Sequence, residues 1–85
     1  MKYKVIFAAN IARQLCRIDR KWQLKIVAAA EALGDNPRPH GYKKLVGEGG
    51  LYRIKAGDYR IIYEVRDNIL VVSVLRIAKR NERTY

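Results

Sequence analysis

The spacing of apolar residues changes twice along this chain, and each change constrains what the chain can fold into. Residues 2–7 (KYKVIF) alternate lysines with apolar side chains, and this period of two predicts a β-strand. Residues 10–33 carry apolar side chains at helical spacing. The alternation then returns in three segments, at about 51–55, 59–66 and 69–78. The order β-α-α-β-β-β predicts an α+β fold in which two helices pack on one face of a mainly antiparallel sheet.

Two antiparallel helices are expected within residues 10–33. Asp19 is the expected N-cap of the second helix, and Gly34, followed closely by a proline, predicts its end. Trp22 begins the apolar stripe of the second helix, so we expect it in the core. The apolar residues at helical spacing are Ile11, Leu15, Ile18, Trp22, Ile26, Ala29, Ala30 and Leu33.

Residues 34–50 connect the helices to the last three strands and contain two prolines, five glycines and no sustained periodicity. We therefore expect an irregular loop. Long ordered loops often carry function, although a solvated basic loop is an equally good interpretation here. The basic and imidazole side chains of this segment are Arg38, His40, Lys43 and Lys44.

The net charge and the cysteine content indicate which kind of partner the protein binds and in which cellular compartment it is expected. The 85 residues give room for one domain, residues 1–85, and carry 18 Lys and Arg against 8 Asp and Glu, a formal charge of +10. Such a balance favours an anionic partner, nucleic acid first and an acidic protein second. Cys16 is the only cysteine, which excludes an internal disulfide or a thiolate cluster and favours the reducing cytoplasm. No apolar run reaches the length of a membrane span, so no membrane association is expected, and neither a metal nor a cofactor is expected.

The segment YRIKAGDYRIIYEV gathers three cations in one hairpin. With a turn at residues 56–57, burial of both apolar sets together places Arg53 opposite Arg60, and Lys55 on the same face. Like charges in direct opposition weaken a sheet by about a few tenths of a kcal/mol, so fold stability does not explain this arrangement. Binding of a phosphodiester to this face of the sheet would explain why the cations are gathered there. The alternative is an ordinary wet face that Asp58 and Glu64 partly neutralise.

The last predicted strand must pair beside this hairpin and so delivers the basic C-terminal residues to the rim of the cationic face. Taken alone, such a run is typical of a solvated tail. The side chains concerned are Arg76, Lys79, Arg80, Arg83 and Tyr85.

The residues exclude several kinds of catalysis and leave one kind open. There is no glycine-rich phosphate loop, no His-x-x-x-His pair, and only one histidine, His40, so a two-histidine ribonuclease mechanism is excluded. RNA, however, carries its own nucleophile in the 2′-hydroxyl. Its cleavage needs a proton acceptor, positive charge on the developing phosphorane and help for the leaving oxygen. Arginine suits the second task, and a lysine crowded by other cations gives up its proton more readily and can act as a base.

Residues 51–85, and in particular YRIKAGDYRIIYEV with the downstream KR...Y, resemble the second half of RelE-type toxins in the RelE/ParE superfamily of bacterial type II toxin-antitoxin systems. The likeness extends over nearly the whole chain. It implies a RelE-like fold and, because RelE members cleave messenger RNA in the ribosomal A site, a ribosome-dependent endoribonuclease. The resemblance implies a catalytic set made of Lys55 as base, Arg60 as stabiliser of the phosphorane, Arg80 as stabiliser or proton donor, and Tyr85 as the stacking residue.

The resemblance also implies partners. We expect a cognate RelB-like antitoxin with an acidic segment, a toxin that is monomeric when free and heteromeric with its antitoxin, and contacts with mRNA and the ribosome. Two alternatives stay open: a ParE-like inhibitor of DNA gyrase that acts by binding, and a non-catalytic regulator that binds nucleic acid. The residues expected to contact RNA or the ribosome are Arg53, Lys43, Lys44, Arg76, Lys79 and Arg83.

Overall fold

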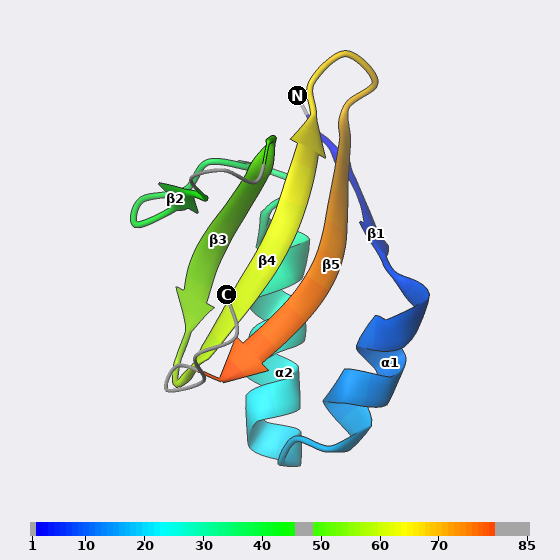
Figure 1. Ribbon diagram of the computed structural model, residues 1–85, viewed down its shortest axis with the longest axis vertical. Coiled ribbons are helices and arrows are strands. Elements are labelled where there is room, and N and C mark those ends of the chain that lie inside the picture. The colour runs from blue at the N-terminus through cyan, green and yellow to red at the C-terminus, as the bar shows by residue number, and fades with distance from the viewer. Residues whose placement is uncertain (1, 46–48, 80–85) are drawn as a thin grey trace.

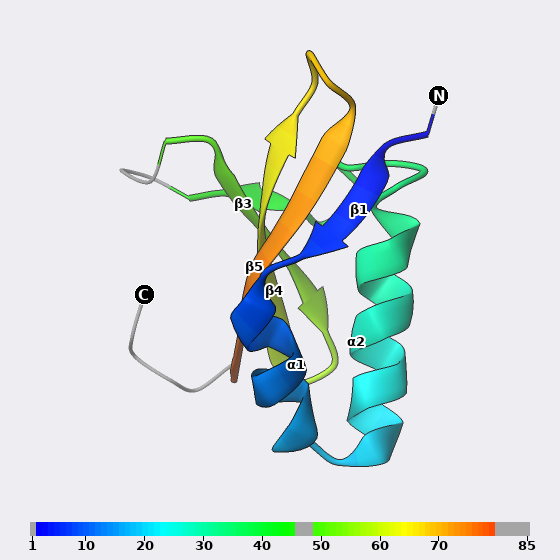
Figure 2. The same ribbon diagram turned by 90° about the vertical axis from the view of Figure 1, so that its right-hand side faces the viewer.

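The structure is a computed structural model that describes residues 2–45 and 49–79. Both helices cover the same face of one sheet, and no helix of the described residues lies on the opposite face (Figure 1, Figure 2). This confirms the predicted α+β class. In chain order the elements are β1 (Lys4–Phe7), α1 (Ala9–Cys16), α2 (Arg20–Ala32), β2 (Lys43–Lys44), β3 (Leu51–Ala56), β4 (Tyr59–Arg66) and β5 (Val71–Lys79).

The sheet has five strands in the order β1-β5-β4-β3-β2. All neighbouring strands are antiparallel except β1 and β5, which are parallel and pair from Lys4 opposite Val71 to Phe7 opposite Val74. The first and last strands of the chain are therefore neighbours (Figure 1). The prediction that β5 pairs beside the β3–β4 hairpin is confirmed.

The expectation of an irregular loop over residues 34–50 is wrong at one place. Lys43 and Lys44 form the short strand β2, which pairs with Arg53 and Tyr52 of β3. Two adjacent lysines carry no alternation of polar and apolar side chains, so the sequence gives no strand signal there. The strand exists because it pairs with the edge of β3.

The two helices run in opposite directions (Figure 2). One glutamine side chain bridges the corner between them. Gln23 Nε2 donates to the backbone oxygens of Leu15 and Ile18, at 2.6 and 2.8 Å, and so satisfies carbonyls at the end of α1. Asp19 occupies the N-cap position of α2 as predicted, although its side chain makes no capping hydrogen bond.

The core lies between the helices and the inner face of the sheet, meaning the face that they cover. Tyr63 is fully buried there, and its hydroxyl donates to the backbone oxygen of Pro37 at 2.7 Å. Burial raises the pKa of Tyr63 to about 12. The predicted core position of Trp22 is confirmed in part, since the ring is half-buried, packs against the core and contacts Tyr59. The largest fully buried side chains are Tyr63, Ile11, Ile26, Leu33, Ile61, Val72 and Val74.

An ion pair anchors the start of the long connection to the turn between β4 and β5. Arg38 donates to both carboxylate oxygens of Asp67, at 3.2 and 2.9 Å, and Tyr3 donates to the same carboxylate. These hydrogen bonds, with that of Arg38 first, lower the pKa of Asp67 to about 2. Arg38 also lies over the ring of Tyr52. The connection is therefore fixed at its start, which positions the residues that follow it.

Within residues 2–45 and 49–79, neither helix combines the length and the apolar character that crossing a membrane requires.

Candidate functional site

The β3–β4 hairpin closes through a two-residue turn at Gly57 and Asp58, and not at residues 56–57 as predicted. Gly57 has φ +63°, and a glycine with positive φ at the first central position is what a type II′ turn requires. The predicted opposition of Arg53 to Arg60 is wrong, because the pairing is displaced by two residues. A displacement by two leaves every side chain on its predicted face.

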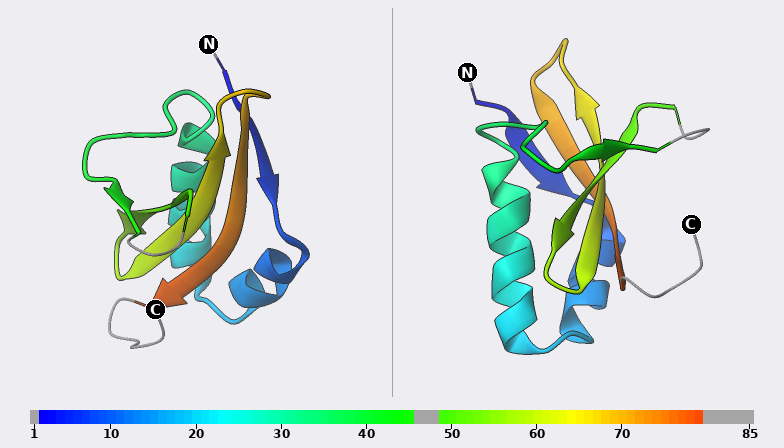
Figure 3. Two further views of the ribbon diagram at one scale, coloured as in Figure 1. Left: turned by 45° about the horizontal axis from the view of Figure 1, so that its top comes forward. Right: turned by 90° about the vertical axis from the view of Figure 1, so that its left-hand side faces the viewer.

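The structure brings like charges into direct opposition at two other places. Lys55 lies opposite Arg60, and Lys43 of β2 lies opposite Arg53. Four strands contribute cations to the outer face of the sheet. Figure 3 shows this face, which lies away from the helices. We call this set the cationic face, and its residues are Lys43, Arg53, Lys55, Arg60 and Arg76.

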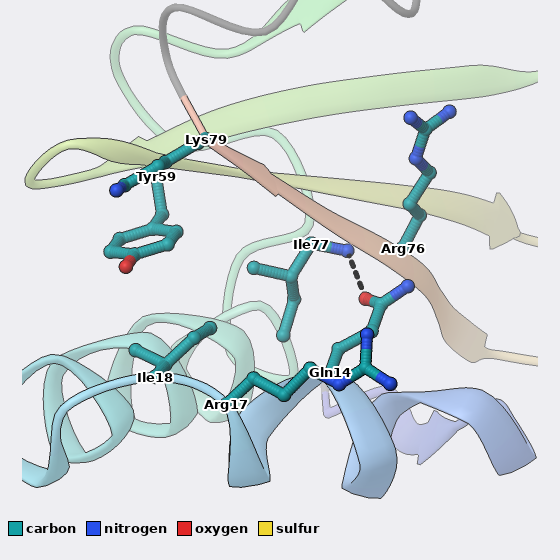
Figure 4. A pocket seen from close by; sticks show the side chains of 7 residues that line it. All are labelled: Gln14, Arg17, Ile18, Tyr59, Arg76, Ile77 and Lys79. Carbon is teal, nitrogen blue, oxygen red and sulfur yellow. Dashed lines mark hydrogen bonds between the residues drawn. The ribbon is translucent and has the colours of Figure 1, made fainter.

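Arg76 reaches the cationic face through an irregularity in β5. The register of β5 against β4 shifts between Tyr63 opposite Val74 and Ile62 opposite Arg76, which leaves Leu75 as an extra residue. An extra residue in a strand moves the side chains that follow it to the opposite face of the sheet from the one that simple alternation predicts. Arg76 consequently points away from the helices, as Figure 4 shows.

One acidic residue of the hairpin has a described ion-pair partner that does not belong to this set. Glu64 forms its described ion pair with Arg66, whose Nε lies 3.2 Å from Oε1. Among the ion pairs of the described residues, none involves Arg53 or Lys55. Arg53 and Lys55 therefore keep their positive charge without an ion pair among the described residues.

Arg53 carries a hydrogen-bond donor that is buried and unused. Its Nη1 atom is inaccessible to solvent and makes no hydrogen bond within the described part of the chain. A buried donor without a partner costs about 1–3 kcal/mol. Such an atom is suited to an anionic ligand whose oxygen would satisfy it.

The structure separates other predicted site residues from the cationic face. Lys44 lies opposite Tyr52, and Lys79 lies opposite Tyr59, so both belong to the inner side of the sheet. Arg38, in the connection, forms its ion pair with Asp67, and His40 is exposed. Three predicted residues lie outside the described part of the chain, namely Arg80, Arg83 and Tyr85.

A groove of about 300 Å³ lies between α1 and the part of β5 that extends beyond β1 (Figure 4). There Gln14 Oε1 accepts a hydrogen bond from the backbone N–H of Ile77 at 2.7 Å. Arg17 also lines this groove and was not predicted as a site residue, because helical spacing alone does not indicate which strand a helical cation will face. The lining residues are Gln14, Arg17, Ile18, Tyr59, Arg76, Ile77 and Lys79.

Within the described ranges no cluster of three or more His, Cys, Asp or Glu side chains is placed to hold a metal ion. The chemistry that these residues themselves offer is binding of anions and stabilisation of negative charge by lysine and arginine.

Comparison with solved structures identifies the class to which this architecture belongs. The chain is similar to the archaeal RelE in the RelE–RelB complex from Pyrococcus horikoshii OT3, with 28% identity, 96% of this chain and 99% of that chain covered, and a TM-score of 0.84. It is also similar to the toxin–antitoxin complex RelBE2 of Mycobacterium tuberculosis, with 27% identity, coverage of 94% and 100%, and a TM-score of 0.82. The fold is that of small toxins from toxin-antitoxin pairs.

Sequence comparison gives the family. A family model described as the ParE toxin of the type II toxin-antitoxin system parDE matches residues 5–84, and the chain therefore belongs to this family. A RelE-like toxin protein of Escherichia coli is 29% identical over 82 residues, which cover 94% of this chain and 85% of that protein. These matches confirm the predicted RelE-type toxin of the RelE/ParE superfamily.

Proposed function

We propose that this toxin is a ribosome-dependent endoribonuclease that cleaves mRNA in the A site. The observation that carries the proposal is the cationic face, where Lys55 opposes Arg60 and a buried Arg53 donor has no described partner. Opposed cations weaken a sheet slightly, and an unused buried donor costs more. A phosphodiester bound on this face relieves both costs.

The chemistry we propose is attack of the 2′-hydroxyl on the adjacent phosphorus. Lys55 is exposed, so its amine can reach a bound strand, and it takes the 2′-proton. Arg60 stabilises the negative charge that develops on the phosphorane. The 5′-oxygen leaves with a proton, for which we propose Arg80 as the source, and the phosphorus ends in a 2′,3′-cyclic phosphate. Tyr85 is proposed to stack on a base.

We expect cleavage to depend on the ribosome because lysine and arginine are weak acid-base catalysts. Lysine and arginine side chains ordinarily titrate far above neutrality, so they are poor acid-base catalysts near pH 7. Correct positioning of the 2′-oxygen, the phosphorus and the leaving oxygen in line can supply several kcal/mol of the barrier. The ribosome holds mRNA in a fixed conformation in the A site and would provide that positioning. The remaining predicted cations would then make salt-sensitive contacts with phosphates.

The test compares cleavage of one mRNA when free and when bound to a programmed ribosome, with the product ends mapped. We expect cleavage on the ribosome, little cleavage of the free RNA, and ends that carry a cyclic phosphate. Equally fast cutting of free RNA, or ends that carry a 3′-hydroxyl, would contradict the mechanism.

The proposed partner is a RelB-type antitoxin with an acidic segment. Two observations support it: the net charge of +10, and the likeness to a RelE that was solved in complex with RelB. An acidic chain gains both charge neutralisation and burial against such a surface. We expect a monomeric free toxin, a heteromeric complex, and binding that weakens as salt is raised.

A second candidate function rests on the family model, which is described as a ParE toxin. A ParE-like protein would inhibit DNA gyrase by binding and would not need the cationic face for chemistry. A gyrase supercoiling assay with the same preparation distinguishes the two functions. Inhibition of supercoiling without cleavage of ribosome-bound mRNA would favour the ParE-like function.

A further inference from the structure

One row of residues crosses the outer face of the sheet perpendicular to its strands. Lys43 lies opposite Arg53, Arg53 lies opposite Ile62, and Ile62 lies opposite Arg76. Residues in direct opposition share a face of the sheet. Neighbouring strands are about 5 Å apart, so the row carries three cations over about 15 Å, from β2 to β5.

A hydrogen bond to β5 connects the end of this row to α1. Ile77 follows Arg76 in the chain and lies beyond Val74, the last residue of β5 that pairs with β1. Its N–H donates to Gln14 Oε1, which leaves the amide nitrogen of Gln14 directed away from that bond (Figure 4). Gln14 Nε2 is therefore a donor of fixed orientation at the groove between α1 and β5.

α1 presents a stripe of donor side chains at the same place. Residues three and four apart share one side of a helix. A hollow of about 290 Å³ lies along this side, and its lining residues, which we call the α1 stripe, are Asn10, Arg13, Gln14 and Arg17. Gln14 and Arg17 line both this hollow and the groove beside β5. None of the described residues that line either space is acidic, so both favour an anion.

The groove beside β5 combines cations with an aromatic ring. Tyr59 and the apolar Ile18 line it together with Arg17 and Lys79. Cations that contact a phosphate backbone, with an aromatic ring on which a base can stack, are the combination that binds single-stranded nucleic acid. An acidic peptide would pair with the cations but has no base to place on the ring. The groove therefore fits RNA better than a peptide.

We propose that the α1 stripe is a second phosphate-binding site for the RNA strand that lies on the cationic face. The strand crosses the sheet along the row from Lys43 to Arg76 and leaves it between β5 and α1. There Gln14 Nε2 and the Arg17 guanidinium donate to one phosphate. This inference takes its ligand from the proposed function, but it concerns binding alone and requires no cleavage.

Binding of an RNA analogue that cannot be cleaved tests this site apart from catalysis. The free toxin is titrated with a 2′-O-methyl oligoadenylate of eight nucleotides and followed by NMR. We expect the side-chain signals of Gln14 and Arg53 to shift along one titration curve with one oligonucleotide bound per toxin. Absence of binding, unchanged Gln14 signals at saturation, or two separate curves would overturn the proposal. If an octaglutamate shifts the Gln14 signals as strongly, the surface fits an acidic protein and the proposal is wrong.

A matched pair of variants separates the site from general charge effects. Gln14→Glu keeps an oxygen that can accept from the N–H of Ile77 but replaces the donor with a carboxylate. Ala12→Glu places the same charge on an exposed position of α1 that lines neither space. We expect the first variant to raise the Kd of the oligonucleotide at least ten-fold and the second to change it less than two-fold. Equal effects would contradict the proposal.

A second pair tests Arg17 and leaves the hydrogen bond between Gln14 and Ile77 intact. Loss of one phosphate contact lowers the slope of log affinity against log salt by about 0.7 for a single strand, and we expect this change for Arg17→Gln. Arg20→Gln, at an exposed position outside the groove, should leave the slope unchanged. Equal slopes for the two variants would overturn the proposed contact. Failure of the RNA cleavage assay would refute the proposed function without affecting these binding results.

Discussion

The two faces of the sheet differ in what holds their side chains in place. On the inner face, Ile54 lies opposite Ile61, and both are buried under the helices. One residue along the same strands, Lys55 lies opposite Arg60 on the outer face. The first pair is stabilised by burial of apolar surface, about 25 cal/mol per Å². The second pair repels and adds nothing to stability. The same two strands therefore build the core on one side and present opposed cations on the other.

This comparison predicts that substitutions on the inner face change stability, while those on the outer face change function at little cost to stability. The largest expected effect is that of Tyr63→Ala. Loss of a fully buried aromatic ring should lower the free energy of unfolding by about 3–5 kcal/mol. Tyr63→Phe keeps the ring and loses only the hydrogen bond to Pro37, so about 1 kcal/mol is expected. Urea unfolding measures both, and a cost below 1 kcal/mol for the alanine would break the comparison.

The turn between β3 and β4 packs against Trp22 on the inner side of the sheet, and substitution of two glycines tests how much this contact matters for stability. A Cβ on Gly57 would lie 2.0 Å from Trp22 Cζ3, on the inner side. Gly57→Ala should cost about 2–4 kcal/mol, from the positive φ and from overpacking. Gly50 also has a positive φ, of +79°, but open space around it. Gly50→Ala should cost only about 1–2 kcal/mol in the same unfolding assay. Equal costs would show that contact with Trp22 is unimportant.

Arg53→Met tests the outer face. Removal of a buried donor that has no described partner should raise the free energy of unfolding by about 1 kcal/mol. Cleavage of ribosome-bound mRNA should fall by about ten-fold or more, since a phosphate contact is lost. The control is Arg66→Met, at a cation whose partner is Glu64, and it should leave cleavage within about two-fold. A loss of stability with unchanged cleavage would show that Arg53 has a structural role.

The smallest expected effect is a loss of stability at low pH. The pKa of Asp67 is about 2 in the folded protein, against an ordinary value of 3.8, so its contribution to stability is complete above about pH 4. That contribution is lost as the pH falls from about 4 to about 2. Asp67→Asn should flatten this part of the stability curve, measured by thermal unfolding at several pH values. In an Arg38→Gln background the same substitution should have a smaller effect, because Arg38 is the larger cause of the lowered pKa and only the hydrogen bond from Tyr3 remains.

The architecture could be predicted because periodicity reports which face each residue occupies. The register of the β3–β4 pairing could not be predicted in this way, because a displacement by two residues leaves every side chain on the same face. Only the position of the turn at Gly57 distinguishes the two registers. β2 was missed because two lysines form no pattern. Within the candidate site, the places of Arg53 and Lys55 were predictable from alternation. The face on which Lys79 lies was not predictable, because the extra residue Leu75 reverses the alternation of side chains between the two faces in the rest of β5.

The parallel pairing of β1 with β5 has a consequence for when the toxin becomes active. Protein synthesis proceeds from the N-terminus, yet the partner of the first strand is the last one, with Lys4 opposite Val71. Contacts between residues so far apart in sequence form late and slowly. Arg76 lies on the same last strand, so the cationic face is also incomplete until β5 has been made. Under the proposed function, the chain therefore lacks its complete RNA-binding face until its last strand has been made, and an antitoxin already present can meet the toxin as it folds.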